Sequence, residues 1–225
     1  MIKLNSLIYK ICLLICGIVG LTWNIMMKVH PTTLEYWGYY TYLSNLAVCV
    51  AMVFSIIAII RNRKPSHELT LWTTVIITLT LLIYHFALRP GYQAKGYNIL
   101  HGANLFVHYI VPLGMIADYI FFDEDKGSLK WFMPLYWIAF PLGYYLWINI
   151  YIWCGGRFTT WLPAENQYEY TKVPYWFLNY EVMGWSKVIF VIFAFVAGFL
   201  VLSYIFWGLD KAIQLYKKHL TNKSK

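Results

Sequence analysis

Charged residues are scarce in this sequence of 225 residues, and their scarcity excludes an ordinary soluble domain. Asp, Glu, Lys and Arg together make up 12% of the chain, whereas hydrophobic residues make up 60% and aromatic residues 20%. Soluble domains have about 25% charged and about 45–50% apolar residues. A water-soluble core of this size cannot hide so many apolar side chains. The sequence therefore predicts an all-α membrane protein that is surrounded by lipid.

Several chemical signatures are also missing. The four cysteines form no C-x-x-C pair and no zinc-type spacing, so we expect no disulfide framework. Cys12 and Cys16 lie one helical turn apart and are predicted to be buried packing residues. The chain has no G-x-S-x-G, no H-E-x-x-H and no phosphate-binding glycine loop. Carboxylates within the apolar runs are too few for a two-carboxylate mechanism. We therefore expect neither a metal nor a cofactor.

Long apolar runs dominate the sequence that remains. A spanning helix needs roughly 20 apolar residues, and such runs cover approximately residues 7–27, 37–60, 69–88, 98–122, 130–153 and 185–207. Short polar breaks separate these runs, except for one long aromatic segment at 154–184. The sequence predicts a single transmembrane domain over 1–225, a polytopic bundle of about six helices in the cell membrane.

The basic residues predict the orientation of this bundle. The formal charge is +8, and 12 of the 18 Lys and Arg residues fall on the side that holds both termini. Because cytoplasmic loops carry an excess of Lys and Arg, this bias predicts cytoplasmic termini and an external 154–184 segment. Trp and Tyr prefer the headgroup level, so we expect this segment to cover the outer mouth of the bundle. Anionic headgroups account for the positive charge, and we expect no nucleic-acid partner.

Polar residues inside the spans gather near the outer ends. Thr41, Ser44 and Asn45 lie on one face of the second span, and His101, Asn104 and His108 lie on one face of the fourth. Three other spans contribute one residue each, namely Asn24, His85 and Asn149. Residues at i, i+3, i+4 and i+7 share a helix face. Ionisable groups inside a membrane usually face the bundle interior and mark functional sites. The alternative is structural, since Ser, Thr and Asn also bond neighbouring helices without any other role.

His108 is the strongest candidate for chemistry. It lies about ten residues, or roughly 15 Å, into the fourth span. A neutral imidazole at that depth needs a partner, and histidine is well suited to act as a general base. A histidine can activate a hydroxyl nucleophile, so Thr41 or Ser44 with His108 is the chemistry that these residues allow. Asp118 is rotated roughly 80° from His108 on the same helix, and capping or bonding a neighbouring helix is an equal alternative for it.

Several short segments resemble a bacterial family of six-helix membrane proteins. Tyr40–Asn45 looks like the F-T-x-x-S-N start of the second helix of that family. Val107–Leu113, followed by Asp118, resembles its fourth helix, and the regions Trp131–Tyr145 and Tyr175–Asn179 fit as well. The resemblance covers most of the chain, and it implies a six-helix fold.

That bacterial family is similar in turn to the eukaryotic androgen-induced and androgen-dependent membrane proteins. These are transmembrane threonine hydrolases that cleave fatty acid esters of hydroxy fatty acids. The resemblance implies that Thr41 is the nucleophile and His108 the catalytic histidine, with Asn104 matching the Asn of an N-H-x-x-H-T-type segment. Leu105 and Tyr109 stand in this chain where that segment has its first His and its Thr.

Three functional hypotheses follow. The first is a membrane-embedded hydrolase or acyl-transfer enzyme that acts on a lipid or fatty acyl ester, with Thr41 as nucleophile and His108 as general base. The second is a lipid-binding or transport protein that uses the same cavity without chemistry, and the third is a structural partner without a ligand. The candidates for substrate contact or oxyanion stabilisation are Ser44, Asn45, His85, His101, Asn104 and Asn149.

Overall fold

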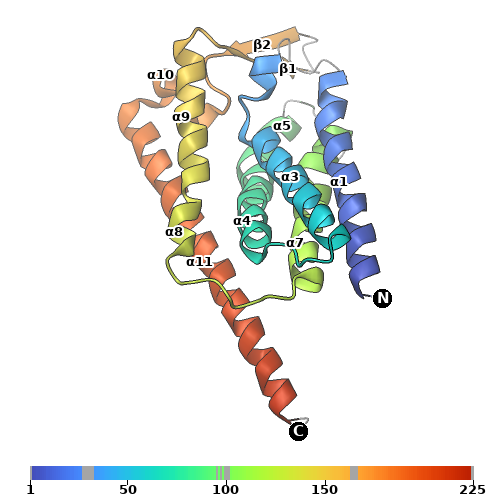
Figure 1. Cartoon of the computed structure of the whole chain (residues 1–225). Helices are drawn as coiled ribbons and strands as arrows, with labels where there is room; N and C mark the ends of the chain where they lie inside the picture. Colours follow the sequence, from blue (N-terminus) through green and yellow to red (C-terminus); the bar gives the residue numbers. More distant parts are fainter. Residues whose placement is uncertain are drawn as a thin grey trace.

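The computed structural model of the chain describes residues 2–26, 33–94, 96, 98, 102–162 and 167–223. Helices dominate it (Figure 1). The elements are α1 (Ile2–Met26), α2 (Thr33–Tyr36), α3 (Tyr40–Ile60), α4 (His67–Ile83), the π-helix η1 (Tyr84–Leu88), α5 (Arg89–Ala94), α6 (Ala103–Leu105), the π-helix η2 (Phe106–Ile110), α7 (Val111–Phe122), α8 (Met133–Trp137), α9 (Ala139–Trp153), β1 (Phe158–Leu162), β2 (Gln167–Thr171), the 3-10 helix η3 (Trp176–Leu178), α10 (Tyr180–Met183) and α11 (Trp185–Lys223).

Within the described residues, five helical stretches are long and apolar enough to cross a membrane: Lys3–Trp23, Tyr40–Ile60, His67–Ala94, Ala103–Phe122 and Trp185–Lys223. The predicted all-α polytopic bundle is thereby confirmed. Large apolar side chains along these helices face outward, for example Phe54 at 59% exposure and Phe193 at 68%. Water would disfavour such a surface, whereas the acyl chains of a bilayer can cover it.

The span predicted at 130–153 is not one continuous helix. Two shorter helices, α8 and α9, follow one another along the bundle and meet at Ile138 (Figure 1). Pro141 explains the break, because its ring has no N–H and clashes with the carbonyl group four residues earlier, that of Trp137. Helical hydrogen bonding resumes where Leu142 N–H donates to the Ile138 carbonyl at 3.1 Å.

The centre of the bundle is formed by α1, α3, α4 and α7, while α8, α9 and α11 lie on the other side of α4 (Figure 1). Each of the four central helices contributes to one core cluster: Leu13, Val48, Ala51, Met52, Ile77, Val111 and Met115. The cysteines differ from the prediction in part. Cys12 is exposed on the outer face of α1 and Cys16 is only partly buried, since the buried face of α1 is the one that carries Leu13.

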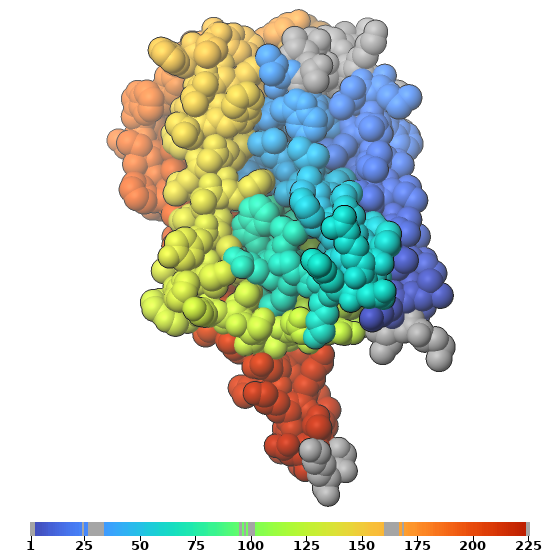
Figure 2. All heavy atoms as spheres, in the orientation of Figure 1, coloured from blue at the N-terminus to red at the C-terminus, as the bar shows by residue number. Residues whose placement is uncertain are grey.

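The last helix continues well past the predicted end at 207. It has 39 residues, which at 1.5 Å per residue gives about 58 Å, roughly twice the hydrocarbon thickness of a bilayer. Figures 1 and 2 show its final part projecting beyond the bundle. Residues 208–223 contain mostly Lys, Leu, Ala and other good helix formers and no Pro, so the helix does not end with the apolar run.

A β-hairpin occupies the aromatic 154–184 segment, where the sequence predicted no strand. Strands β1 and β2 pair antiparallel, with Phe158 opposite Thr171. Both strands are rich in aromatic residues and Thr, which favour extended strands. The buried Glu35 of α2 anchors the hairpin by accepting hydrogen bonds from the backbone N–H and the side chain of Thr159. The hairpin therefore sits over the end of the bundle where α3 begins.

Candidate functional site

A narrow cavity of about 90 Å³ lies at the hairpin end of the bundle. One water needs about 10–15 Å³ by the same measure, so the cavity has room for several small groups. Its walls are mostly hydrocarbon and aromatic and come from α3, α4, η1, α9, α11 and the segment around η3. The lining residues are Tyr40, Thr41, Leu79, Thr80, Ile83, Tyr84, Leu88, Pro141, Leu142, Tyr144, Tyr145, Tyr175, Phe177, Leu178, Ile192, Phe195 and Val196.

Thr41 lines this cavity and lies in the first turn of α3. The first N–H groups of a helix have no partner within the helix, and here the Tyr175 hydroxyl accepts from the Tyr40 N–H at 3.1 Å. Tyr175 also interacts with the Thr41 side chain. Burial raises the pKa of the Tyr175 hydroxyl, which therefore stays protonated. The 154–184 segment thus supplies a polar group to the cavity.

Two π-helical turns face each other beside the cavity. Residues Tyr84 and His85 lie on η1, and His108 and Tyr109 lie on η2. The Tyr84 ring stacks on the His108 ring with centroids 3.6 Å apart and an interplanar angle of 8°. The His85 Nδ1 lies 3.1 Å from the Tyr109 hydroxyl. In both contacts a tyrosine of one π-helical turn meets a histidine of the other. Such π-turns are frequent at functional sites.

Polar atoms without partners cluster around these turns. Within the described part of the chain, the Tyr84 hydroxyl, the His108 Nδ1 and the Asn45 Oδ1 are buried and accept or donate no hydrogen bond. A buried polar atom without a partner is unfavourable by about 1–3 kcal/mol. Tyr84 alone among these three residues also lines the cavity.

The predicted nucleophile and the predicted base have different surroundings. Thr41 lines the cavity, whereas His108 is a buried residue of η2 that does not line it and stacks on Tyr84. No hydrogen bond joins Thr41 to His108 in the described part of the chain. The proposed Thr41–His108 pair therefore stays a hypothesis that needs a change of side-chain arrangement.

Ser44 and Asn45 bond neighbouring helices. The Ser44 hydroxyl lies 2.7 Å from the Thr80 hydroxyl and 2.9 Å from the Thr41 carbonyl oxygen. Asn45 donates to the Thr41 carbonyl at 2.8 Å and, across to η2, to the Val107 carbonyl at 3.0 Å. Both side chains are fully buried and neither lines the cavity. Their contacts join α3 to α4 and to η2.

The other predicted site residues lie farther from the cavity wall. His85 is bonded to Tyr109, and Asn104 is half-buried on α6; neither lines the cavity. Asn149 is exposed and donates to the Tyr145 carbonyl of its own helix at 2.6 Å, so the structure does not bring it to the cavity. His101 and the side chain of Asn24 lie outside the described residues.

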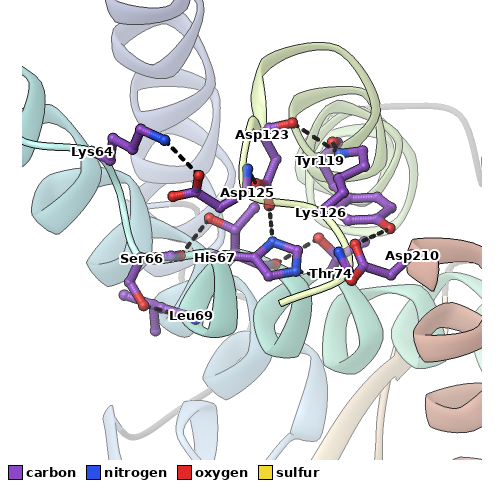
Figure 3. A network of polar contacts seen from close by, with 12 residues as sticks. Lys64, Ser66, His67, Leu69, Thr74, Tyr119, Asp123, Asp125, Lys126 and Asp210 are labelled. Atoms are coloured by element: carbon purple, nitrogen blue, oxygen red, sulfur yellow. Dashed lines mark hydrogen bonds and ion pairs between the residues drawn. The ribbon is translucent and has the colours of Figure 1, made fainter. Parts of the chain in front are cut away.

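A second polar network lies at the opposite end of the bundle, and sequence reasoning missed it. Figure 3 shows His67 of α4 between Asp123 and Asp210. The His67 Nδ1 is 2.6 Å from Asp123 Oδ2, and its Nε2 is 3.0 Å from Asp210 Oδ2. Ionised carboxylates only accept hydrogen bonds, so both ring nitrogens must donate and His67 is an imidazolium. Asp210 also accepts from the Tyr119 hydroxyl at 3.0 Å and from the Gly127 N–H at 2.6 Å. This network fastens α11 to α4 and to the loop after α7.

Asp118 forms an ion pair with Lys10 on α1, and both side chains are almost completely buried. Of the two alternatives that the sequence left open for Asp118, this contact favours the structural one, in which Asp118 bonds a neighbouring helix. Its second oxygen, Oδ2, has no hydrogen-bond partner in the described residues.

The chain has no detected relative whose function could be compared with this geometry. No protein-family model matches the chain, and neither a curated protein nor a solved structure shows significant similarity to it. Among the described residues, no group of three or more His, Cys, Asp and Glu side chains could hold a metal ion.

Proposed function

We propose that this protein binds a single-chain lipid, either a fatty acid or a fatty acyl ester, in the cavity beside η1. The acyl chain would lie along the hydrocarbon walls that Leu79, Ile83, Leu142 and Ile192 supply. Its carbonyl group would lie among the hydroxyl groups at the other side of the cavity. Ligand sites of this kind are mostly apolar, with a few polar groups that fix the orientation.

The Tyr84 hydroxyl is the observation that carries this proposal. This hydroxyl is buried and has no partner among the described residues, and it belongs to a side chain that lines an apolar cavity, so a small movement of the side chain would bring it to a ligand there. A carbonyl or carboxylate oxygen could accept its hydrogen. The N-terminus of α3 supports the same placement, because Thr41 lies in its first turn and the positive end of a helix dipole favours an oxygen that carries negative charge.

The orientation predicted from the Lys and Arg bias would place this cavity toward the outer leaflet. A lipid would then enter laterally between α9 and α11, since both helices contribute lining residues. The segment that carries Tyr175 and Phe177 would close the cavity toward the water.

A Tyr84→Phe variant tests the binding proposal. Because the hydroxyl has no partner without a ligand, its removal should not lower stability, while the phenyl ring can still stack on His108. Loss of one hydrogen bond of about 1 kcal/mol should weaken the binding of a fluorescent fatty acid about fivefold. Tyr204→Phe, a half-buried tyrosine of α11 away from the cavity, is the matched control. Equal affinity in the parent and both variants would contradict the proposal.

Ester hydrolysis is a second candidate, and one observation favours it. A buried histidine with an unpartnered Nδ1, His108, contacts Tyr84, which itself lines the cavity beside Thr41. In this reaction the Thr41 oxygen would attack the ester carbonyl and its proton would pass to His108. The protonated histidine would then protonate the leaving alcohol, and water would release the acid from the acyl-threonine.

Turnover of a fatty acyl nitrophenyl ester separates the two candidates. Thr41→Ala should abolish hydrolysis and keep fatty acid binding, whereas Thr41→Ser should retain part of the activity. His108→Ala should lose as much activity as Thr41→Ala, and the double variant no more, because a nucleophile and its base act as one unit. Full hydrolysis by Thr41→Ala would exclude Thr41 as the nucleophile, and absence of turnover in the parent protein would leave binding as the function.

A further inference from the structure

A second cavity, of about 280 Å³, lies at the end of the bundle opposite the hairpin. It is lined by Lys3, Ser6, Lys10, Ile59, Asn62, Arg63, Lys64, Pro65, Thr70, Phe122, Asp123, Glu124 and Asp125. Four of these side chains are cationic and three are carboxylates. This second cavity is thus polar, whereas the cavity beside η1, here called the acyl-chain cavity, is mostly apolar. The two cavities share no lining residue.

One face of α1 supplies three of the polar groups. Lys3, Ser6 and Lys10 stand at i, i+3 and i+7, which places them in one stripe along the helix. Ser6 is 7% exposed and Lys10 is 1% exposed, so both are part of the bundle interior. The Lys10 ammonium carries three hydrogens, and Asp118, which does not line the cavity, accepts one of them.

The carboxylates of the lining are largely neutralised by cations of their own. Asp125 pairs with Lys64 at 2.6 Å, and Asp123 pairs with the imidazolium of His67, also at 2.6 Å. Lys3, Arg63 and Glu124 form no ion pair with any described residue. These unpaired lining groups are two cations and one carboxylate, so the lining keeps a net positive charge.

We propose that this cavity binds a phosphate group through Lys3, Lys10 and Arg63, with the Ser6 hydroxyl as a further donor. Arg and Lys are the side chains that hold phosphate in charge-assisted hydrogen bonds, and Arg does so with two parallel bonds. Basic pockets between helices at the end of a membrane bundle suit anionic lipid headgroups. The same chemistry would also accept free inorganic phosphate.

Two probes distinguish these sources of phosphate. Binding of phosphatidylglycerol is measured by native mass spectrometry on the full chain in phosphatidylcholine nanodiscs, and binding of inorganic phosphate is measured by calorimetry in a non-ionic detergent. Lys3→Gln and Arg63→Gln each remove one lining charge. Lys130→Gln is the matched control, because Lys130 is an exposed cation near the same end that does not line the cavity.

Lys3→Gln and Arg63→Gln should each weaken binding about tenfold, the effect of losing one charge-assisted hydrogen bond, while Lys130→Gln should leave it unchanged. A loss seen with phosphatidylglycerol alone identifies a lipid headgroup, and a loss seen with inorganic phosphate identifies the free ion. Absence of binding with both probes would overturn the proposal. So would an equal loss in all three variants, since that would indicate unspecific attraction to a basic surface.

Discussion

The buried ion pair between Lys10 and Asp118 offers the sharpest test of how this bundle is held together. The two side chains are 2% and 0% exposed. Lys10→Met keeps the length of the side chain but leaves the Asp118 carboxylate buried, with neither oxygen paired, because Oδ2 already lacks a partner. Removal of one member of such a pair typically destabilises a protein by about 3–5 kcal/mol. We therefore expect Lys10→Met to lower the free energy of unfolding by about that amount.

The double variant Lys10→Met, Asp118→Leu removes both charges and should recover stability to within about 1 kcal/mol of the parent. Lys64→Met is the matched control, since its pair with Asp125 is 63% and 41% exposed and should contribute about 1 kcal/mol or less. The assay is equilibrium unfolding in mixed micelles of increasing SDS content, followed by tryptophan fluorescence. A loss below about 1 kcal/mol in Lys10→Met, or a double variant as unstable as the single one, would refute the reasoning.

Two further predictions concern packing and orientation. A Cβ at Gly20 would lie 2.9 Å from Phe106 Cβ, so Gly20→Ala should destabilise the protein by about 1–3 kcal/mol in thermal unfolding. Gly198 has open space around it, so Gly198→Ala, as the control, should change stability by less than about 0.5 kcal/mol. Reporters fused after the last residue and inside the hairpin should read cytoplasmic and external, respectively; the reverse result would place the acyl-chain cavity toward the inner leaflet.

The β-hairpin was not predicted, because a search for long apolar runs detects spanning helices and misses short strands. Phe158–Leu162 and Gln167–Thr171 are rich in aromatic residues and Thr, but each is too short to stand out beside helices of 20 residues or more. The hairpin is held by Glu35, which lies 124 positions before Thr159. A local pattern could have predicted the strands, whereas their place over the cavity depends on that distant contact.

The candidate site was predictable only in part, because contacts between distant segments also decide which side chains reach the cavity. Spacing correctly placed Thr41 on an inward face of α3, and it is a cavity residue. It grouped Asn149 with the same site because both lie near a span end, but depth does not decide rotation, and Asn149 faces outward. Tyr84 was not singled out, since one tyrosine among 20 carries no signal until the structure shows that its hydroxyl is buried without a partner and that its side chain lines the cavity.

By itself, the sequence determined that the chain is an all-α membrane bundle, because hydropathy is a local sum that needs no knowledge of neighbouring helices. Only the tertiary structure decided which polar groups meet. Lys10 and Asp118 are 108 positions apart, and His67 and Asp210 are 143 apart. Such contacts depend on the rotation and relative shift of whole helices, which the packing of every side chain along the interface sets together. The spacing of polar residues within one helix restricts that rotation but does not choose the partner.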